Sequence, residues 1–178
     1  MGAFLLAAAA FVVMEPVSYL SHRFVMHRFG MAWHRSHHVP TEGPFEANDL
    51  FPVCFSVVTM MAMTAAVTLP SLRPLLWVGI GSTAYGAAYL FVHEVYIHAR
   101  AGRLPRLRGL EHLKEAHRVH HLFGGEPYGM LVPVVPRALR ERARRSDRDV
   151  LEELRAGPVA ARAGRAGRAS RAATASFS

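Results

Sequence analysis

The sequence is almost without cysteine: Cys54, inside an apolar run, is the only one among 178 residues. A single cysteine excludes an internal disulfide and a zinc site built from cysteine pairs, and it gives no indication of the redox compartment. Charge is absent from two long stretches, 51–69 and 75–92, although charged residues make up 19% of the chain. The hydrophobic content of 51% is concentrated in such runs, which indicates a membrane protein and not a soluble core.

Three apolar runs have the composition of membrane-spanning helices. The first, 3–14, continues weakly to residue 20 and lacks the basic start and small-residue cleavage site of a signal peptide. The second, 51–69, would extend roughly 28 Å as a helix, close to the thickness of the hydrocarbon core. A turn with two prolines separates it from the third run, 75–92. The third run contains small residues that allow close helix contact: Gly79, Gly81, Ser82, Gly86 and Ala87.

Two further segments are expected at the membrane surface. Residues 107–122 have the pattern of a helix that lies on or just under one face of the membrane. Residues 128–135 form a short apolar stretch between Pro127 and Pro136, too short to span the membrane but suited to its interface. We therefore predict an all-α integral membrane bundle with three to four spans.

The arginines are distributed unevenly around the spans. Only Arg73 lies between the second and third runs, whereas seven arginines follow soon after the first or the third: Arg23, Arg28, Arg35, Arg100, Arg103, Arg106 and Arg108. Because positive residues concentrate in cytoplasmic loops, this excess places 22–50 and 93–178 in the cytoplasm. The prediction is a multi-pass protein of the inner (cytoplasmic) membrane with all eleven histidines on its cytoplasmic face.

We divide the chain into a membrane-embedded domain, 1–136, and a basic tail, 137–178. The tail carries eleven arginines against five acidic residues, a net charge of +6. Beside membrane spans, this charge indicates contact with anionic lipid headgroups and not with nucleic acid. From residue 155 onward the tail contains little besides alanine, glycine and arginine, and we expect the tail to be disordered.

Ten of the eleven histidines fall into four tight groups: His22 and His27; His34, His37 and His38; His93 and His98; His117, His120 and His121. In a helix, positions i, i+3 and i+4 lie within an arc of about 100°, so the three rings of each triplet can converge on metal. The rings of each His-x4-His pair would lie about 140° apart on a regular helix. Such a pair straddles a site, reaches two metals or needs a local distortion.

Ten imidazoles are more than one metal ion uses, and two ions with five nitrogens each would account for all of them. Neutral imidazole suits iron, zinc, copper and nickel, so the ligands alone leave a redox site and a hydrolytic zinc pair both open. The His93-Glu94 pair does not match a zinc peptidase, which needs its second histidine at i+4. His112 lies outside every group and is given no ligand role. Glu15, near the end of the first run, either serves the site or reaches the interface.

Three stretches besides the histidines carry a resemblance to a known family: 30–33 (GMAW), 43–50 (GPFEANDL) and 83–86 (TAYG). With the four histidine groups in order, they make residues 10–125 resemble the bacterial β-carotene hydroxylases of the fatty acid hydroxylase and sterol desaturase superfamily. Two departures are a shortened 123–136 segment and Glu-Val-Tyr-Ile at 94–97, where the family often has Asp-Gly and aliphatic residues. Both leave the preference for plain or ketolated rings open.

The resemblance implies a non-haem di-iron monooxygenase that takes a carotenoid substrate, O2 and two electrons from ferredoxin or a similar carrier. The implied reaction is hydroxylation of carbon 3 of the β-ionone rings, from β-carotene through cryptoxanthin to zeaxanthin. The implied iron ligands are His22, His27, His34, His37, His38, His93, His98, His117, His120 and His121, with no catalytic residue beyond them. Two alternatives are a hydroxylase or desaturase of a sterol or fatty acyl chain, and a non-enzymatic metal-binding or metal-transport membrane protein.

Two more sets of residues near the ligands are given roles. Polar side chains are expected to orient the imidazoles through the other ring nitrogen: Glu46, Asn48, Asp49 and Glu94. Apolar side chains are expected to line a groove, open to lipid, for a long polyene: Phe24, Met26, Phe29, Trp33, Phe91 and Tyr96. The alternative for the apolar set is ordinary helix packing.

Overall fold

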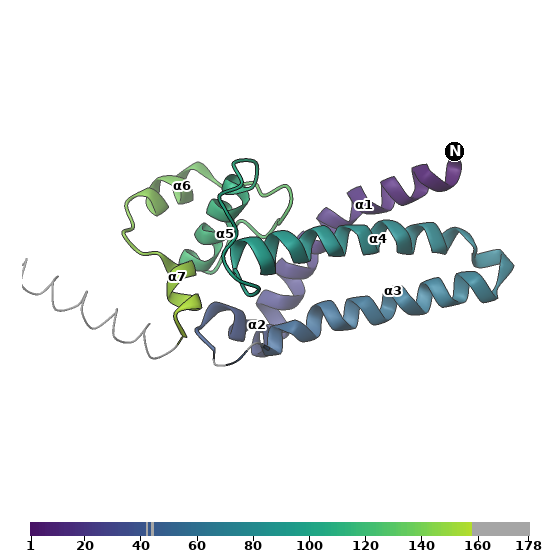
Figure 1. Cartoon of the computed structure of the whole chain (residues 1–178), viewed down its shortest axis with the longest axis horizontal. Helices are drawn as coiled ribbons and strands as arrows, with labels where there is room; N and C mark the ends of the chain where they lie inside the picture. The colour runs from purple at the N-terminus through teal and green to yellow at the C-terminus, as the bar shows by residue number, and fades with distance from the viewer. Residues whose placement is uncertain (42, 44, 158–178) are drawn as a thin grey trace, which may run out of the picture.

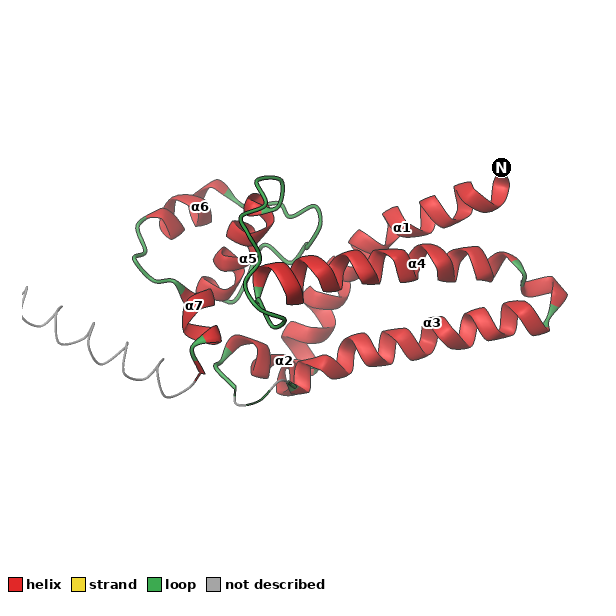
Figure 2. Ribbon diagram, in the orientation of Figure 1, coloured by secondary structure: helices red, strands yellow, loops and turns green. Residues whose placement is uncertain are grey.

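The computed structural model describes residues 1–41, 43 and 45–157. The regular secondary structure of this part of the chain is all helical, joined by loops, and contains no strand (Figure 2). The long helices are α1 (Gly2–Leu20), α3 (Leu50–Thr68) and α4 (Pro74–Leu90). The shorter α-helices are α2 (Met31–His38), α5 (Glu111–Phe123), α6 (Arg137–Arg144) and α7 (Val150–Arg155). Two π-helices, η1 (Ser21–Phe29) and η4 (Phe91–Ile97), continue α1 and α4, and two 3-10 turns, η2 (Ala47–Asp49) and η3 (Pro70–Leu72), flank α3.

Three helical segments of the described chain are long and apolar enough to cross a membrane: Gly2–Phe29, Ala47–Thr68 and Pro74–Ile97. The helices α1, α3 and α4 run along the long axis of the molecule, and the N-terminus lies at the same end as the α3–α4 turn (Figure 1). The shorter helices α2, α5, α6 and α7 gather at the opposite end (Figure 1). The prediction of an all-α membrane protein with at least three spans is confirmed.

Helix α4 lies between α1 and α3 and packs against both of them (Figure 1). Glycines on α4 make the close approach possible. A Cβ atom on Gly81 would overlap the carbonyl oxygen of Ala7 and come within 2.9 Å of the Ala10 Cβ on α1. A Cβ atom on Gly79 would overlap the side chain of Met63 on α3. These small residues therefore hold the three spans together, as expected where helices associate without a hydrophobic driving force.

The part of the tail that the structure describes is folded, although the tail was expected to be disordered, and the domain boundary at residue 136 stays a prediction. Residues 137–157 include α6 and α7, and α7 inserts Val150 and Leu151 into a buried apolar cluster with Ile97 and Leu113. The physical reason is that a few apolar residues suffice to dock a short helix, although the average composition of the tail is basic. The alanine-, glycine- and arginine-rich stretch 158–178, expected to be disordered, lies outside the described residues.

Candidate metal centre

The ten grouped histidines meet at the end of the spans that is opposite to the α3–α4 turn. They come from η1, α2, η4 with the residue that follows it, and α5. The two π-helices explain how the His-x4-His pairs reach this place. His98 N donates to His93 O at 2.9 Å, an i→i+5 hydrogen bond that brings the two side chains to the same side of the helix. Of the alternatives expected for the His-x4-His pairs, the structure therefore adopts the local distortion of the helix.

The first group of converging rings, called cluster one, consists of His22, His27, His34, His38 and His120. The Nε2 atom of His34 lies 3.1 Å from the Nε2 atoms of His22 and His27 and 3.0 Å from that of His38. The Nε2 atom of His120 closes the group at 3.2 Å from His27 and 3.3 Å from His38. Five ring nitrogens are therefore linked by close contacts, and those of His22, His27, His34 and His120 all lie within 4.8 Å of one another.

The second group, called cluster two, consists of His37, His93, His98, His117 and His121. The Nε2 atom of His117 lies 2.9 Å from that of His98 and 2.8 Å from that of His121. Potential ligand atoms of His37, His93, His98 and His117 all lie within 4.8 Å of one another. The Nε2 atom of His37 is buried and has no hydrogen-bond partner among the described residues. A metal ion in the cluster would give this atom a partner.

Hydrogen bonds on the far side of the rings decide which nitrogen faces the cluster centre. The Nδ1 atoms of His22 and His120 donate to the carbonyl oxygens of Tyr128 (3.0 Å) and Gly125 (2.6 Å). A carbonyl oxygen only accepts, so the proton sits on Nδ1 and Nε2 carries the lone pair. The Nδ1 atom of His34 donates likewise to Asn48 Oδ1 at 2.7 Å. In these three rings of cluster one, the Nε2 atom therefore carries a lone pair that points toward the neighbouring rings.

A cation at the centre of each cluster accounts for this crowding. Facing lone pairs repel each other, and one proton cannot be shared among three or four nitrogens. Metal–nitrogen bonds of about 2.0–2.1 Å at right angles would separate neighbouring nitrogens by roughly 3 Å. The measured separations of 2.8–3.3 Å match that value. The residues present therefore fit two metal ions, each with an all-imidazole ligand set.

Burial keeps the rings in the form that binds metal. It lowers the pKa of His34 to about 3, with additional repulsion from His37 and His27. Burial also lowers the pKa values of His37, His117 and His120 below that of a free imidazole. A histidine must be neutral to coordinate a metal ion, so these rings are ready to bind at neutral pH.

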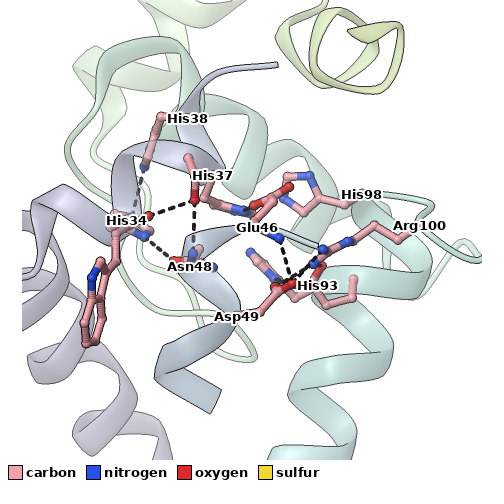
Figure 3. Close-up of polar contacts among 12 residues, drawn as sticks. His34, His37, His38, Glu46, Asn48, Asp49, His93, His98 and Arg100 are labelled. Carbon is pink, nitrogen blue, oxygen red and sulfur yellow. Dashed lines mark hydrogen bonds and ion pairs between the residues drawn. The ribbon is translucent and has the colours of Figure 1, made fainter. Parts of the chain in front are cut away.

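Three of the four predicted orienting residues contact an imidazole, and two of them, Glu46 and Asn48, are labelled in Figure 3. Besides Asn48, Glu46 accepts from His37 Nδ1 at 3.3 Å and Glu94 accepts from His93 Nδ1 at 2.7 Å. The fourth, Asp49, makes no such contact. It accepts hydrogen bonds at 2.8 Å from the Arg100 guanidinium, which also pairs with Glu94 at 2.8 Å. Asp49 therefore acts on His93 only through Arg100 and Glu94, which corrects its assignment.

The apolar set is divided by the structure. Phe24, Phe29, Trp33 and Phe91 are exposed on the helices that carry the ligands, and Met26 is half-buried. Tyr96, by contrast, is only 5% exposed and belongs to the apolar cluster with Val150 and Leu151. Its hydroxyl donates to Glu111 and accepts from Leu107 N at 3.0 Å. Tyr96 is thus a packing residue, which corrects its assignment, and the groove lined by the other five stays a prediction.

Sequence reasoning missed the carbonyl oxygens of Gly125 and Tyr128 and the guanidinium of Arg100. Every residue has a backbone carbonyl whatever its side chain, so no sequence signal could have identified these two acceptors. Arg100 was considered only for its charge in the topology argument, although it follows the histidine pair closely. His112 is exposed and lies outside both clusters, in agreement with its having been given no ligand role.

Comparison with known proteins agrees with this geometry. The model of the family described as fatty acid hydroxylase matches residues 7–140, which include all ten clustered histidines. The chain belongs to the fatty acid hydroxylase family. The resemblance inferred from the sequence motifs is confirmed, because the curated relatives are carotenoid enzymes by name. No solved structure gives a significant match.

Two bacterial relatives are each 40% identical to this chain and are named β-carotene hydroxylase. The protein of Pantoea ananas aligns over 115 residues, 64% of this chain and 65% of its own length. That of Pseudescherichia vulneris aligns over 123 residues, 68% of this chain and 69% of its own length. A chloroplastic β-carotene 3-hydroxylase of Haematococcus lacustris is 36% identical over 74% of this chain but 43% of its own length.

Proposed function

We propose that this chain is an iron-dependent membrane hydroxylase that acts on carbon 3 of the β-ionone rings of carotenoids, converting β-carotene through cryptoxanthin to zeaxanthin. The observation that carries the proposal is the gathering of ten imidazoles in two clusters, in each of which four rings have potential ligand atoms within 4.8 Å of one another. The names of the relatives support the substrate class and the position that is hydroxylated.

The choice of iron follows from the reaction. An unactivated ring C–H bond requires a strong oxidant, which iron supplies with O2 and which zinc, having no redox chemistry, does not. One oxygen atom of O2 becomes the new hydroxyl group, and the other leaves as water after taking up two electrons and two protons. We assign the two electrons to ferredoxin or a similar carrier. The protein holds the ions, fixes the tautomer of the imidazoles and keeps the rings neutral.

The proposed location follows from the spans and the arginines. A carotenoid dissolves in the hydrocarbon core, and the exposed aromatic side chains on η1 and η4 give it an apolar surface beside the clusters. We place the chain in the inner membrane with both clusters facing the cytoplasm, because the arginine-rich segments lie at the cluster end of the spans. A soluble electron carrier reaches the clusters from that side.

The position of the histidines argues against metal transport. Transport requires ligands along a path through the membrane, near its midplane. All ten clustered histidines instead lie at one end of the spans, and the described part of the opposite end contains no histidine. The clusters therefore suit chemistry at one membrane face.

Pigment analysis of β-carotene-producing cells that express this chain tests the proposal. We expect chromatography to show new 3-hydroxylated carotenoids, first with one hydroxylated ring and then with two. Unchanged β-carotene, with the protein present in the membrane and a ferredoxin and its reductase co-expressed, would contradict the proposed substrate. A sterol or fatty acyl chain would then become the substrate to test.

A further inference from the structure

Residues 124–132, here called the strap, run from the C-terminal end of α5 back along the first span. The strap provides the two backbone carbonyls that hold His22 and His120 of cluster one, from Tyr128 and Gly125. It provides no such hydrogen bond to cluster two, whose rings His37 and His93 are held by side-chain carboxylates. A change in the position of the strap would therefore move hydrogen-bond acceptors of cluster one and not those of cluster two.

A single carboxylate fixes the far end of the strap. Glu15 Oε1 accepts from the backbone N–H groups of Met130 and Val132, each at 3.0 Å. Its Oε2 accepts from Leu131 N at 3.1 Å and from the Tyr85 hydroxyl of α4 at 2.6 Å. Four donors thus point at one side chain, and three of them are consecutive strap amides.

The sequence of the strap is adapted to this contact. A Cβ atom on Gly129 would lie 3.0 Å from Glu15 Oε1 and 3.2 Å from the carbonyl oxygen of Val132, which is tighter than most real Cβ contacts. Glycine therefore lets the backbone reach the carboxylate. The neighbouring Met130 is only 2% exposed, so the strap is packed against the helices at this point.

We propose that Glu15 is a positioning residue of cluster one: it holds the strap so that the Gly125 and Tyr128 carbonyls keep His22 and His120 in the metal-binding tautomer. The inference rests on the proposed metal centre and deepens it. Glu15 touches neither an imidazole of the cluster nor the substrate in this scheme, and its effect passes through the backbone. Groups that orient metal ligands typically change metal affinity by roughly 10–100-fold.

The test is the iron content of purified protein after dialysis against nitrilotriacetate, measured by elemental analysis per chain. Glu15→Gln offers one acceptor oxygen where the carboxylate offers two, and its amide group would face N–H donors. We expect this variant to keep one ion of the wild type's two. Gly129→Ala displaces the same carboxylate without removing it and is expected to act in the same direction. Tyr85→Phe, which leaves all three strap amides bonded, is expected to keep both ions.

Double variants identify the cluster that is affected. Glu15→Gln combined with His27→Ala, in cluster one, should lose no more iron than either change alone, because both act on the same ion. Glu15→Gln combined with His98→Ala, in cluster two, should lose both ions. Retention of two ions by Glu15→Gln, or loss of iron by Tyr85→Phe to the same extent, would overturn the role of Glu15. A wild-type chain without iron would instead refute the metal centre itself.

Discussion

His120→Ala is expected to abolish the formation of hydroxylated carotenoids while leaving the chain inserted in the membrane. The imidazole belongs to cluster one and contacts His27 and His38 through Nε2, so its loss removes a ligand from a site that has no spare one. Because changes to groups that merely orient ligands cost roughly 10–100-fold, loss of a ligand should reduce activity by more than that. Chromatography of pigments, normalised to membrane-bound protein, measures the effect.

The matched control is His112→Ala, which changes an exposed histidine of the same helix, α5. It should retain most of the activity, because His112 lies outside both clusters. His37→Ala, His38→Ala and His121→Ala should behave as His120→Ala does. If His112→Ala were inactive and His120→Ala active, the assignment of ligands would be wrong.

Glu94→Ala is expected to lower hydroxylation by roughly 10–100-fold through a weaker hold on the metal of cluster two. Glu94 accepts the Nδ1 proton of His93 at 2.7 Å and is held by Arg100. Without it, the ring of His93 loses the partner that fixes its tautomer and orientation. Product formation at low and at saturating iron separates weaker metal binding, which iron restores, from a defect in chemistry, which it does not.

The network around Arg100 predicts an order of effects. Asp49→Ala should lower activity less than Glu94→Ala, since Asp49 reaches His93 only through Arg100 and Glu94. Glu141→Ala, at an exposed position of α6, serves as the control and should have no effect. Equal activity of Glu94→Ala and Glu141→Ala would show that the carboxylate does not orient the imidazole.

The spans and the location of the histidines could be predicted because both depend on local sequence. A run without charge such as 51–69 indicates a membrane helix whatever surrounds it, and arginine counts place the loops on one side. The grouping of ten histidines required only that four segments lie at the same end of the spans. The structure gathers the rings in two groups, in each of which four histidines have potential ligand atoms within 4.8 Å of one another, and five nitrogens for each of two ions stays a prediction.

What could not be predicted depends on contacts between distant segments. The π-helical turns at His22–His27 and His93–His98 cannot be inferred from propensity, because they form where two rings must reach one point. The docking of α7 depends on Val150 and Leu151 meeting the apolar surface of η4 and α5. Tyr96 was assigned to substrate because it lies between two ligands in sequence, whereas its side chain turns toward Glu111.

Glu15 shows both what the sequence could predict and what it could not. An acidic residue inside an apolar run is costly, so the sequence marked it as either functional or interfacial. Only the structure identifies its partners, the amides of Met130, Leu131 and Val132, more than a hundred residues away along the chain. A carboxylate can be recognised in a sequence, but backbone donors have no sequence signature.

The most direct measurement for the two-metal account is the number of iron ions bound per chain in the wild type, in His27→Ala and in His98→Ala. Two ions are expected in the wild type and one in each variant, because His27 and His98 belong to different groups of potential metal ligands and each change disables one group and leaves the other intact. A folded wild-type chain that binds one ion or none when supplied with iron(II) would contradict the account.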